Sequence, residues 1–251
     1  MDTDHQPRIL RFEGARNVRD LGGLPSAGGA RTRFGIVIRA DGLSRLTDAD
    51  VAQLARLRLR TIIDLRYDEE RARPPDRVPV MDAPAVYHRG FCPQCSDALF
   101  HAINIRGVGA SEAAALMCAN YARMPFEHAG PFGDVMRHLI APDTAPHLVH
   151  CTSGKDRTGL LAAFVLLALE VPREVVFDDY GLSNGDWQPI DLFDDKASRE
   201  AIDAMMAAPP DYLAAALDAI DARCGSFSAY LEHWLGYGPR ERATLADLML
   251  E

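Results

Sequence analysis

The sequence lacks the long apolar runs that would place the chain in a membrane or direct it out of the cell. No apolar stretch approaches the roughly 18 residues that a membrane-spanning helix needs. The first residues, Met1 to Arg8, are polar and hold no apolar segment of the kind found in a secretion signal. We therefore expect no membrane span and no classical export, and the sequence leaves non-classical secretion open.

Positive charge and cysteine are also scarce. The chain has 27 Lys and Arg against 36 Asp and Glu, a net charge of −9, which argues against nucleic acid or an anionic membrane as a partner. An anionic substrate stays compatible, because the local field of a pocket can oppose the net charge. Five cysteines, an odd number, in a chain without an export signal predict a reducing compartment, the cytoplasm.

Apolar residues, in contrast, are plentiful. They make up 48% of the 251 residues, enough for one sizeable core. The length allows one large domain or two small ones. No internal repeat or low-complexity tract divides the chain, so we expect a single domain over residues 8–251, preceded by a disordered tail over residues 1–7.

The most informative stretch is HCTSGKDRTG, residues 150–159. Leu148 and Val149 before it indicate the end of a buried strand, and the apolar run Leu160 to Leu169 after it indicates a buried helix. The segment is therefore predicted to be a strand, a tight loop and a helix. This order places a cysteine and an arginine six positions apart around a loop that ends at a helix N-terminus.

That arrangement suits phosphoryl transfer. A thiolate is the nucleophilic form of cysteine, and a helix N-terminus with nearby cations lowers a cysteine's pKa. Backbone N–H groups over residues 152–157 would form an anion cradle, and the Arg157 fork matches two phosphate oxygens. Thr158 could offer its hydroxyl to the sulfur of Cys151. The pattern predicts a phosphate dianion attacked by Cys151 through a cysteinyl-phosphate.

Cys151-x5-Arg157 resembles the signature of the cysteine-dependent tyrosine phosphatases. The full ten-residue string is similar to the atypical bacterial branch of the protein-tyrosine phosphatase B type, which acts on phosphotyrosine, phosphoserine and phosphoinositides. A second motif of that family, Asn-x-Arg-Asp-Leu-Gly-Gly, matches residues 17–23. The resemblance implies a metal-independent, cofactor-free phosphomonoesterase that acts on a phosphorylated protein or a phosphoinositide, and it leaves dual specificity open.

The same resemblance assigns roles to individual residues. Cys151, Arg157 and Asp156 are expected to be catalytic. The substrate-binding residues are expected to be Thr152, Ser153, Gly154, Lys155 and Thr158, with Lys155 at the rim of the loop. The supporting residues are expected to be His150, Asp20, Asp64 and Arg66, with Asp20 contacting the loop and His150 orienting it. Arg39 could also reach the loop or be a surface charge.

The general acid is the least determined of these roles. Many cysteine phosphatases use the aspartate of a Trp-Pro-Asp loop, and that tripeptide is absent here. Asp156 inside the loop is the natural donor, although the neighbouring Arg157 would oppose its protonation. Asp64 and Asp186 remain rivals.

The rest of the chain predicts an α/β fold of the tyrosine-phosphatase type. Strands are expected over residues 34–39, 61–66 and 85–88, with an amphipathic helix from a Thr47 cap between the first two. This βαβ order implies a mostly parallel sheet with helices on both faces. Residues 8–12 are expected to form an edge strand, 17–23 a glycine-rich turn and 68–71 a solvated helix start. Further helices are expected over residues 111–123, 130–140, 173–180, 211–223, 227–235 and 240–250.

Several alternatives stay open. Residues 186–210 are expected to be irregular and to form either a lid over the pocket or an inert insertion. His88, Cys92, Cys95 and His101 could bind zinc, and the two cysteines could form a redox pair, but a surface loop with two thiols is favoured.

Two other functions also remain. One is a phosphate-binding module without turnover, and the other is a rhodanese-like sulfurtransferase with its own cysteine loop. The sequence does not decide the oligomeric state.

Overall fold

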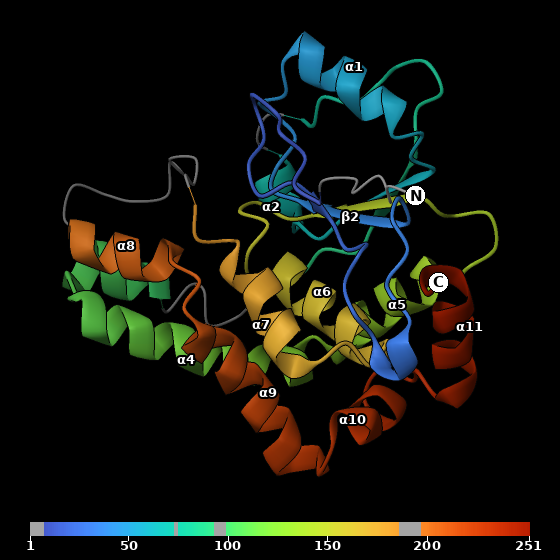
Figure 1. The fold of residues 1–251 in the computed structure, drawn as a ribbon. Helices are drawn as coiled ribbons and strands as arrows, with labels where there is room; N and C mark the ends of the chain where they lie inside the picture. Colours follow the sequence, from blue (N-terminus) through green and yellow to red (C-terminus); the bar gives the residue numbers. More distant parts are fainter. Residues whose placement is uncertain (1–7, 73–74, 93–98, 186–196) are drawn as a thin grey trace.

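The computed structural model describes residues 8–72, 75–92, 99–185 and 197–251 (Figure 1). The expected tail over residues 1–7 and the first part of the expected lid, 186–196, lie outside these ranges. Within them, no helix combines the length and the apolar character that crossing a membrane requires.

A five-stranded sheet in the order β1-β2-β5-β3-β4 forms the centre of the molecule. β2 (Val37–Ala40), β5 (His147–His150), β3 (Thr61–Asp64) and β4 (Ala85–His88) run parallel, and β1 (Arg19–Asp20) pairs with β2 in the antiparallel sense. All residues of β2, β3 and β5 are buried, polar ones such as Arg39 and Asp64 included, so these strands are covered on both faces. The mostly parallel sheet is confirmed.

The register of the sheet fixes where a site can form. Ala40 at the end of β2 and Asp64 at the end of β3 both pair with His150 at the end of β5. Three neighbouring strands therefore finish at one level. Ligands of parallel α/β sheets bind beyond the carboxyl ends of the strands, so the loop after β5 emerges at the favoured edge.

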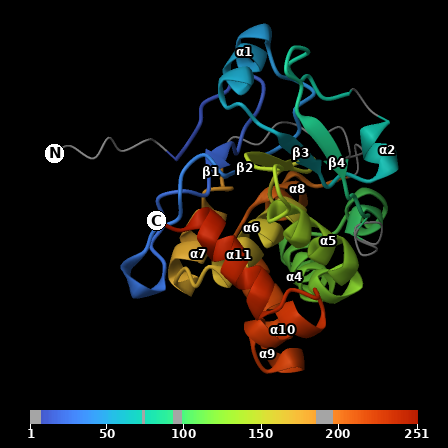
Figure 2. The ribbon, with the colours of Figure 1, turned by 90° about the vertical axis from the view of Figure 1, so that its right-hand side faces the viewer.

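Helices cover both faces of the sheet, but unequally. α1 (Asp48–Arg56) and its flanking loops lie on one face, over a small core that contains Ile38, Ile62 and Leu148 (Figures 1 and 2). The larger core lies on the other face, with the remaining long helices. α1 begins with the expected capping box, in which Thr47 and Asp50 bond each other's backbone N–H.

The helix after the loop is the centre of the larger core. α6 (Arg157–Ala168) begins earlier than the apolar run suggested, and all of its residues except Leu167 are buried. α5 (Ala129–Leu139), α7 (Arg173–Gly181) and α10 (Phe227–His233) pack against it. A helix enclosed in this way holds the loop at its N-terminus rigidly.

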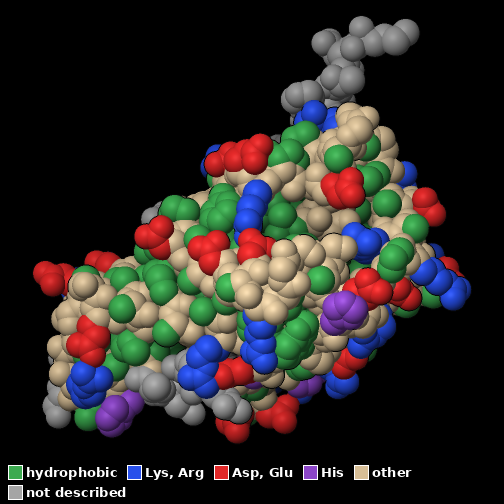
Figure 3. All heavy atoms as spheres, turned by 90° about the horizontal axis from the view of Figure 1, so that it is seen from below, with side chains coloured by type: hydrophobic (Ala, Val, Ile, Leu, Met, Phe, Trp, Pro, Cys, Tyr) green, Lys and Arg blue, Asp and Glu red, His purple; other side chains and the backbone are tan. Residues whose placement is uncertain are grey.

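An outer group of helices lies farther from the sheet. α4 (Ala110–Glu127) packs against α8 (Arg199–Met206) and α9 (Pro210–Cys224). α11 (Pro239–Met249) ends the chain. Figure 3 views the molecule from the α9 and α10 side, where acidic and basic side chains are interspersed among apolar ones.

Three local expectations are wrong. Residues 8–12 form no strand and contribute one isolated bridge, Ile9 to Arg19, whereas the expected turn at 17–23 contains β1. α4 was expected to start at Ser111, but it begins at Ala110, with Gly109 as its N-cap. Residues 199–206, expected to be irregular, form α8, because Ser198 caps the segment by accepting the N–H of Ala201.

Candidate active site

The loop from Cys151 to Asp156 connects β5 to α6. Cys151 is 1% exposed at its base. Gly154 has a φ of +66°, and a Cβ there would lie 2.5 Å from the carbonyl oxygen of Ala40, so only glycine fits. Among the described residues, no acceptor takes a backbone N–H of Thr152 to Asp156. The buried Cys151 is therefore followed by a run of backbone donors that are unpaired within the described chain.

The guanidinium of Arg157 is held inside the protein with one edge left open. Its Nη1 donates to the carbonyl oxygens of Leu65 at 3.1 Å and Phe91 at 3.2 Å, and to Glu70 at 2.6 Å. Its Nη2 donates to the other Glu70 oxygen at 2.6 Å. Nε and the second Nη2 hydrogen have no acceptor within the described chain, and this edge can bind two phosphate oxygens.

Glu70 is the functional residue that the sequence did not reveal. It was expected in a solvated helix start, but α2 (Asp68–Arg71) turns it inward, where it also accepts the hydroxyl of Thr152. Burial opposes the ionisation of Glu70, but its bonds to Arg157 and Thr152 outweigh this and lower its pKa. One signal was available: an arginine predicted in an apolar interior requires a carboxylate partner.

Asn17 and Arg39 hold the loop from the side of β2. The Asn17 amide donates to the carbonyl oxygens of Gly154 at 3.0 Å and Ser153 at 3.4 Å. Arg39 donates to the same Gly154 oxygen at 2.8 Å and pairs with Asp179 at 2.8 Å. The second motif therefore supports the loop as expected.

Asp20 does not form the expected hydrogen bond with the loop; it bonds other backbone groups instead. Its carboxylate accepts the N–H groups of Gly22 at 2.7 Å and Gly35 at 2.8 Å. Asp20 orders the turn that follows β1, and the direct bond to the loop comes from Asn17, three residues earlier.

Lys155 points inward and not toward the rim. Its side chain is 3% exposed, and Nζ donates to the carbonyl oxygens of Met205 and Ala207 at the end of α8. It also lies 3.3 Å from Asp156 and 5.5 Å from the centre of the Tyr212 ring. Burial lowers its pKa. The expected rim cation is therefore a tether between the loop and α8.

Thr158 does not form the expected bond to the sulfur of Cys151. Its hydroxyl oxygen is buried and has no hydrogen-bond partner within the described chain. Thr158 follows the first residue of α6, so its side chain is carried by the helix and not by the loop.

Asp156 occupies the N-cap position of α6 but makes no capping bond with its side chain. Its carboxylate is instead bonded by the Tyr121 hydroxyl at 2.7 Å and faces the Ser153 hydroxyl at 3.5 Å. The Asp156 side chain is 28% exposed, so the group is partly open to the outside. A carboxyl in this place can reach a group bound in the loop.

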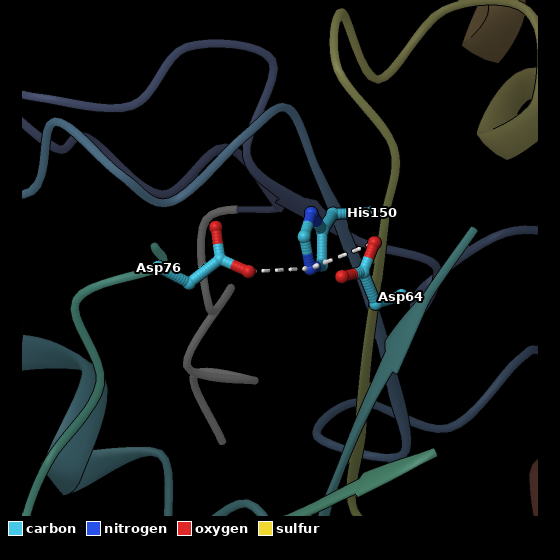
Figure 4. Close-up of side chains that lie close together, drawn as sticks. All are labelled: Asp64, Asp76 and His150. Atoms are coloured by element: carbon cyan, nitrogen blue, oxygen red, sulfur yellow. Dashed lines mark ion pairs between the residues drawn. The ribbon is translucent and has the colours of Figure 1, made fainter. Parts of the chain in front are cut away.

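Asp64, Arg66 and His150 form a buried cluster at the ends of β3 and β5, and the half-buried Asp76 joins them. Figure 4 shows Asp76 and Asp64 on either side of the His150 ring. The imidazole Nε2 of His150 lies 3.5 Å from Asp76 and 3.9 Å from Asp64, and its Nδ1 lies 3.2 Å from the carbonyl oxygen of Cys151. Arg66 bonds both carboxylates. Asp64, Asp76 and His150 could each offer a metal ligand atom, but the guanidinium already supplies the positive charge.

The same cluster removes Asp64 as a rival acid. Burial opposes its ionisation, but two side-chain bonds from Arg66 at 3.0 and 2.9 Å, with the charge of His150 and the Arg66 N–H, lower its pKa. A carboxylate held ionised cannot donate a proton. The other rival, Asp186, and the Cys95 member of the suggested metal or redox group lie outside the described residues.

Comparisons with known proteins identify the family of this chain. The model of the tyrosine phosphatase family matches residues 10–251. A Cupriavidus necator protein named as a candidate tyrosine-protein phosphatase is 30% identical over 234 residues, which cover 88% of this chain and 82% of that protein. The triple specificity protein phosphatase PtpB of Mycobacterium tuberculosis is 28% identical over 261 residues, 89% of this chain and 92% of that one.

Among solved structures, the core catalytic domain of the PP-IP phosphatase SIW14 from S. cerevisiae superposes with a TM-score of 0.40. It is 15% identical, over 72% of this chain and 85% of that one.

Proposed function

This chain belongs to the tyrosine phosphatase family and is a cysteine-dependent phosphoric monoester hydrolase, and we propose that Cys151, Arg157 and Asp156 carry its chemistry. One observation supports these roles above the others. The buried Cys151 is followed directly by backbone N–H groups that are unpaired within the described chain, and Arg157, with its open edge, comes next at the start of α6. A phosphate monoester can bind all of these groups at once.

The reaction has two steps. In the first, the Cys151 sulfur attacks phosphorus, the bond from phosphorus to the ester oxygen breaks, and Asp156 gives its proton to the leaving oxygen. The products are an alcohol or phenol and a cysteinyl-phosphate. In the second, water attacks phosphorus, its proton passes to Asp156 and the sulfur leaves as a thiolate. Inorganic phosphate is released and the enzyme is restored.

The loop residues contribute mainly charge and position. Arg157 and the N–H groups from Thr152 to Asp156 bind the equatorial oxygens, on which the charge of a loose transition state is spread. The hydroxyls of Thr152 and Ser153 bond Glu70 and Asp156, so they orient these partners. His150, Asp64 and Arg66 keep the strand ends in register beneath the loop.

Phosphotyrosine in proteins is the proposed substrate. Because Lys155 is committed to two carbonyl oxygens, it does not offer a free second cation for a substrate with several phosphates. The family resemblance makes phosphoserine, phosphothreonine and phosphoinositides the second candidate, and one relative is named as a triple specificity protein phosphatase. A turnover panel over these substrate classes, with Cys151→Ser as the inactive control, tests the choice. Faster release of phosphate from phosphoinositides than from phosphotyrosine peptides would contradict it.

We also propose that the described end of the 186–210 segment is a lid. α8 lies on α4, and the two carbonyl oxygens at its end are bonded by Lys155 of the loop. Opening of this segment would break those bonds and free the ammonium group. Movement of α8 and access to the loop are therefore linked.

The chain is proposed to act as one domain over residues 8–251 in the cytoplasm. The shared sheet and the continuous large core support a single unit. Within the described residues, Cys118, Cys151 and Cys224 carry free thiols, which is compatible with a reducing compartment.

Two other functions are tested by simple assays. A binding module would retain affinity for phosphate esters and release no phosphate. A sulfurtransferase would convert thiosulfate and cyanide to thiocyanate and sulfite. We expect the wild type to hydrolyse aryl phosphates and to form no thiocyanate. Cys151→Ser should show only background in both assays.

A further inference from the structure

We propose that Tyr121 is a positioning residue that fixes which oxygen of Asp156 carries the transferable proton, with Tyr180 as the donor behind it. This inference rests on the function proposed above, in which Asp156 is the general acid. Tyr121 lies in α4 and Tyr180 in α7, and neither belongs to the loop motif.

The three side chains form a line of short hydrogen bonds. The Tyr121 hydroxyl lies 2.7 Å from Oδ1 of Asp156 and 2.7 Å from the Tyr180 hydroxyl. Tyr121 is 0% exposed and Tyr180 is 1% exposed, whereas the Asp156 side chain is 28% exposed. The line therefore runs from the interior to the one member that a substrate can reach.

The two oxygens of Asp156 have different surroundings. Oδ1 receives the Tyr121 hydroxyl and lies 3.3 Å from the Lys155 ammonium, so two donors point at it. Oδ2 has the Ser153 hydroxyl at 3.5 Å. A neutral carboxyl has one accepting oxygen and one protonated oxygen. Because Oδ1 must accept, the proton belongs on Oδ2, and Oδ2 donates it to the leaving oxygen.

The direction of donation along the line is also fixed. The single proton of Tyr121 is used on Asp156, so Tyr180 must donate to Tyr121. Burial, with the charge of Asp156, raises the pKa of Tyr121 well above its ordinary value, so the hydroxyl stays protonated. The other titratable groups that face Asp156 are Lys155, Arg157 of α6 and Tyr212 of α9.

The test is kcat of Tyr121→Phe with two substrates, compared as a ratio. Phenyl phosphate has a poor leaving group that needs the proton, and 4-nitrophenyl phosphate has a good one. Without the Tyr121 donor, the proton of Asp156 is no longer confined to Oδ2, the oxygen that donates it. We expect kcat for phenyl phosphate to fall about 10-fold, with a smaller fall for 4-nitrophenyl phosphate, so that the ratio of the two kcat values changes.

Tyr230→Phe is the matched control. The Tyr230 hydroxyl is equally buried and bonds the carbonyl oxygen of Pro125 in the same helix α4 at 2.7 Å, but it does not bond Asp156. A purely structural loss on α4 would affect both variants alike and would lower kcat for both substrates by the same factor. Tyr180→Phe serves as the second variant, with a smaller change of the same substrate ratio expected.

Asp156→Asn separates the two possible failures. If it lowers kcat selectively for phenyl phosphate, but Tyr121→Phe and Tyr180→Phe keep the wild-type ratio of the two kcat values, the inference about Tyr121 is overturned and the function stands. If Asp156→Asn shows no preference between the two substrates, the acid role proposed for Asp156 fails, and the inference fails with it.

Discussion

The carboxylate of Glu70 and the guanidinium of Arg157 lie end to end, with both pairs of nitrogen and oxygen atoms 2.6 Å apart. Each side chain is largely buried, at 14% and 9% exposure. The pair leaves one edge of the guanidinium for a substrate. Glu70 therefore decides how the cation of the loop is presented, although it is 87 residues away in the chain.

Glu70→Gln removes the charge of this pair and keeps its shape. Arg157 then remains buried with one weaker partner, and its open edge is less well oriented. We expect kcat/KM for an aryl phosphate to fall about 10- to 100-fold, because misplacement of a binding group by about 1 Å has effects of this size. Glu69→Gln, at an exposed neighbouring position, is the control and should match the wild type. Equal kinetics of the two variants would refute the role of Glu70.

Asn17→Gly removes the amide that bonds Gly154 and Ser153. Glycine is the appropriate substitute because Asn17 has a φ of 55°, which glycine adopts without strain. We expect the inhibition constant of vanadate, an analogue of bound phosphate, to rise about 10-fold from the loss of two loop bonds. Asp20→Asn should lower the thermal midpoint and leave vanadate binding nearly unchanged. The opposite ranking would restore Asp20 as the contact to the loop.

Gly154→Ala places a Cβ against the Ala40 carbonyl oxygen at a backbone conformation that alanine avoids. The loop must distort, and we expect kcat/KM to fall at least about 100-fold. Gly130→Ala is the control, since a Cβ there meets no atom within 4 Å. Steady-state kinetics of both variants, with circular dichroism to verify folding, tests this, and retention of more than a tenth of the activity by Gly154→Ala would contradict it.

Asp179→Asn should show a stability loss that depends on pH. Burial disfavours the charged form of Asp179, but Arg19 and Arg39 outweigh it and hold its pKa well below the ordinary value. A depressed pKa contributes stability above about pH 4, the ordinary range of an aspartate, and this is lost as the pH falls through the native pKa. At pH 7, urea unfolding should show that Asp179→Asn has a free energy of unfolding about 3 kcal/mol below that of the wild type.

Nearer pH 3, the free energies of unfolding of the wild type and Asp179→Asn should differ by less. A gap that stays constant, or that widens on acidification, would mean that the carboxylate is not ionised by its arginines in the native state.

Lys155→Met cuts the tether between the loop and the end of α8. Methionine retains the apolar length of the side chain but cannot donate to the carbonyl oxygens of Met205 and Ala207. We expect amide hydrogen exchange in Arg199–Met206 to accelerate about 10-fold. The reason is that loss of the two bonds lowers the free energy of local opening by about 1 to 2 kcal/mol. Exchange in α5 serves as the internal reference. Unchanged exchange in α8 would show that the lid is held by other contacts.

Local patterns predicted the frame of this protein well, for a physical reason. Strand propensity and helix capping are properties of short stretches of chain. β4 has the predicted limits Ala85–His88, although its residues are exposed or half-buried, and the capping box at Thr47 is the one observed. The loop between β5 and α6 followed from the same reasoning, because glycine and a run of polar residues separated two apolar segments.

The partners of the site residues were harder to predict, because partnership depends on tertiary distance. Glu70 looks like a solvated residue in its own neighbourhood, and only the arrangement of α2 beside the loop gives it Arg157. Lys155 sits in a motif that suggests a rim position, but the end of α8, fifty residues on, offers it two carbonyl oxygens. Asn17 and Asp20 are equally suited to hold the loop by residue type, and the register of β1 separates them.

The hydrogen bond between Arg8 and Asp179 has a practical consequence. Its guanidinium bonds Asp179, 171 residues later, and so joins Arg19 and Arg39 on a carboxylate that steadies the support of the loop. The family match begins at residue 10. A recombinant chain trimmed to that limit would omit one of the three cations, so boundaries drawn from sequence similarity alone would yield a less robust enzyme.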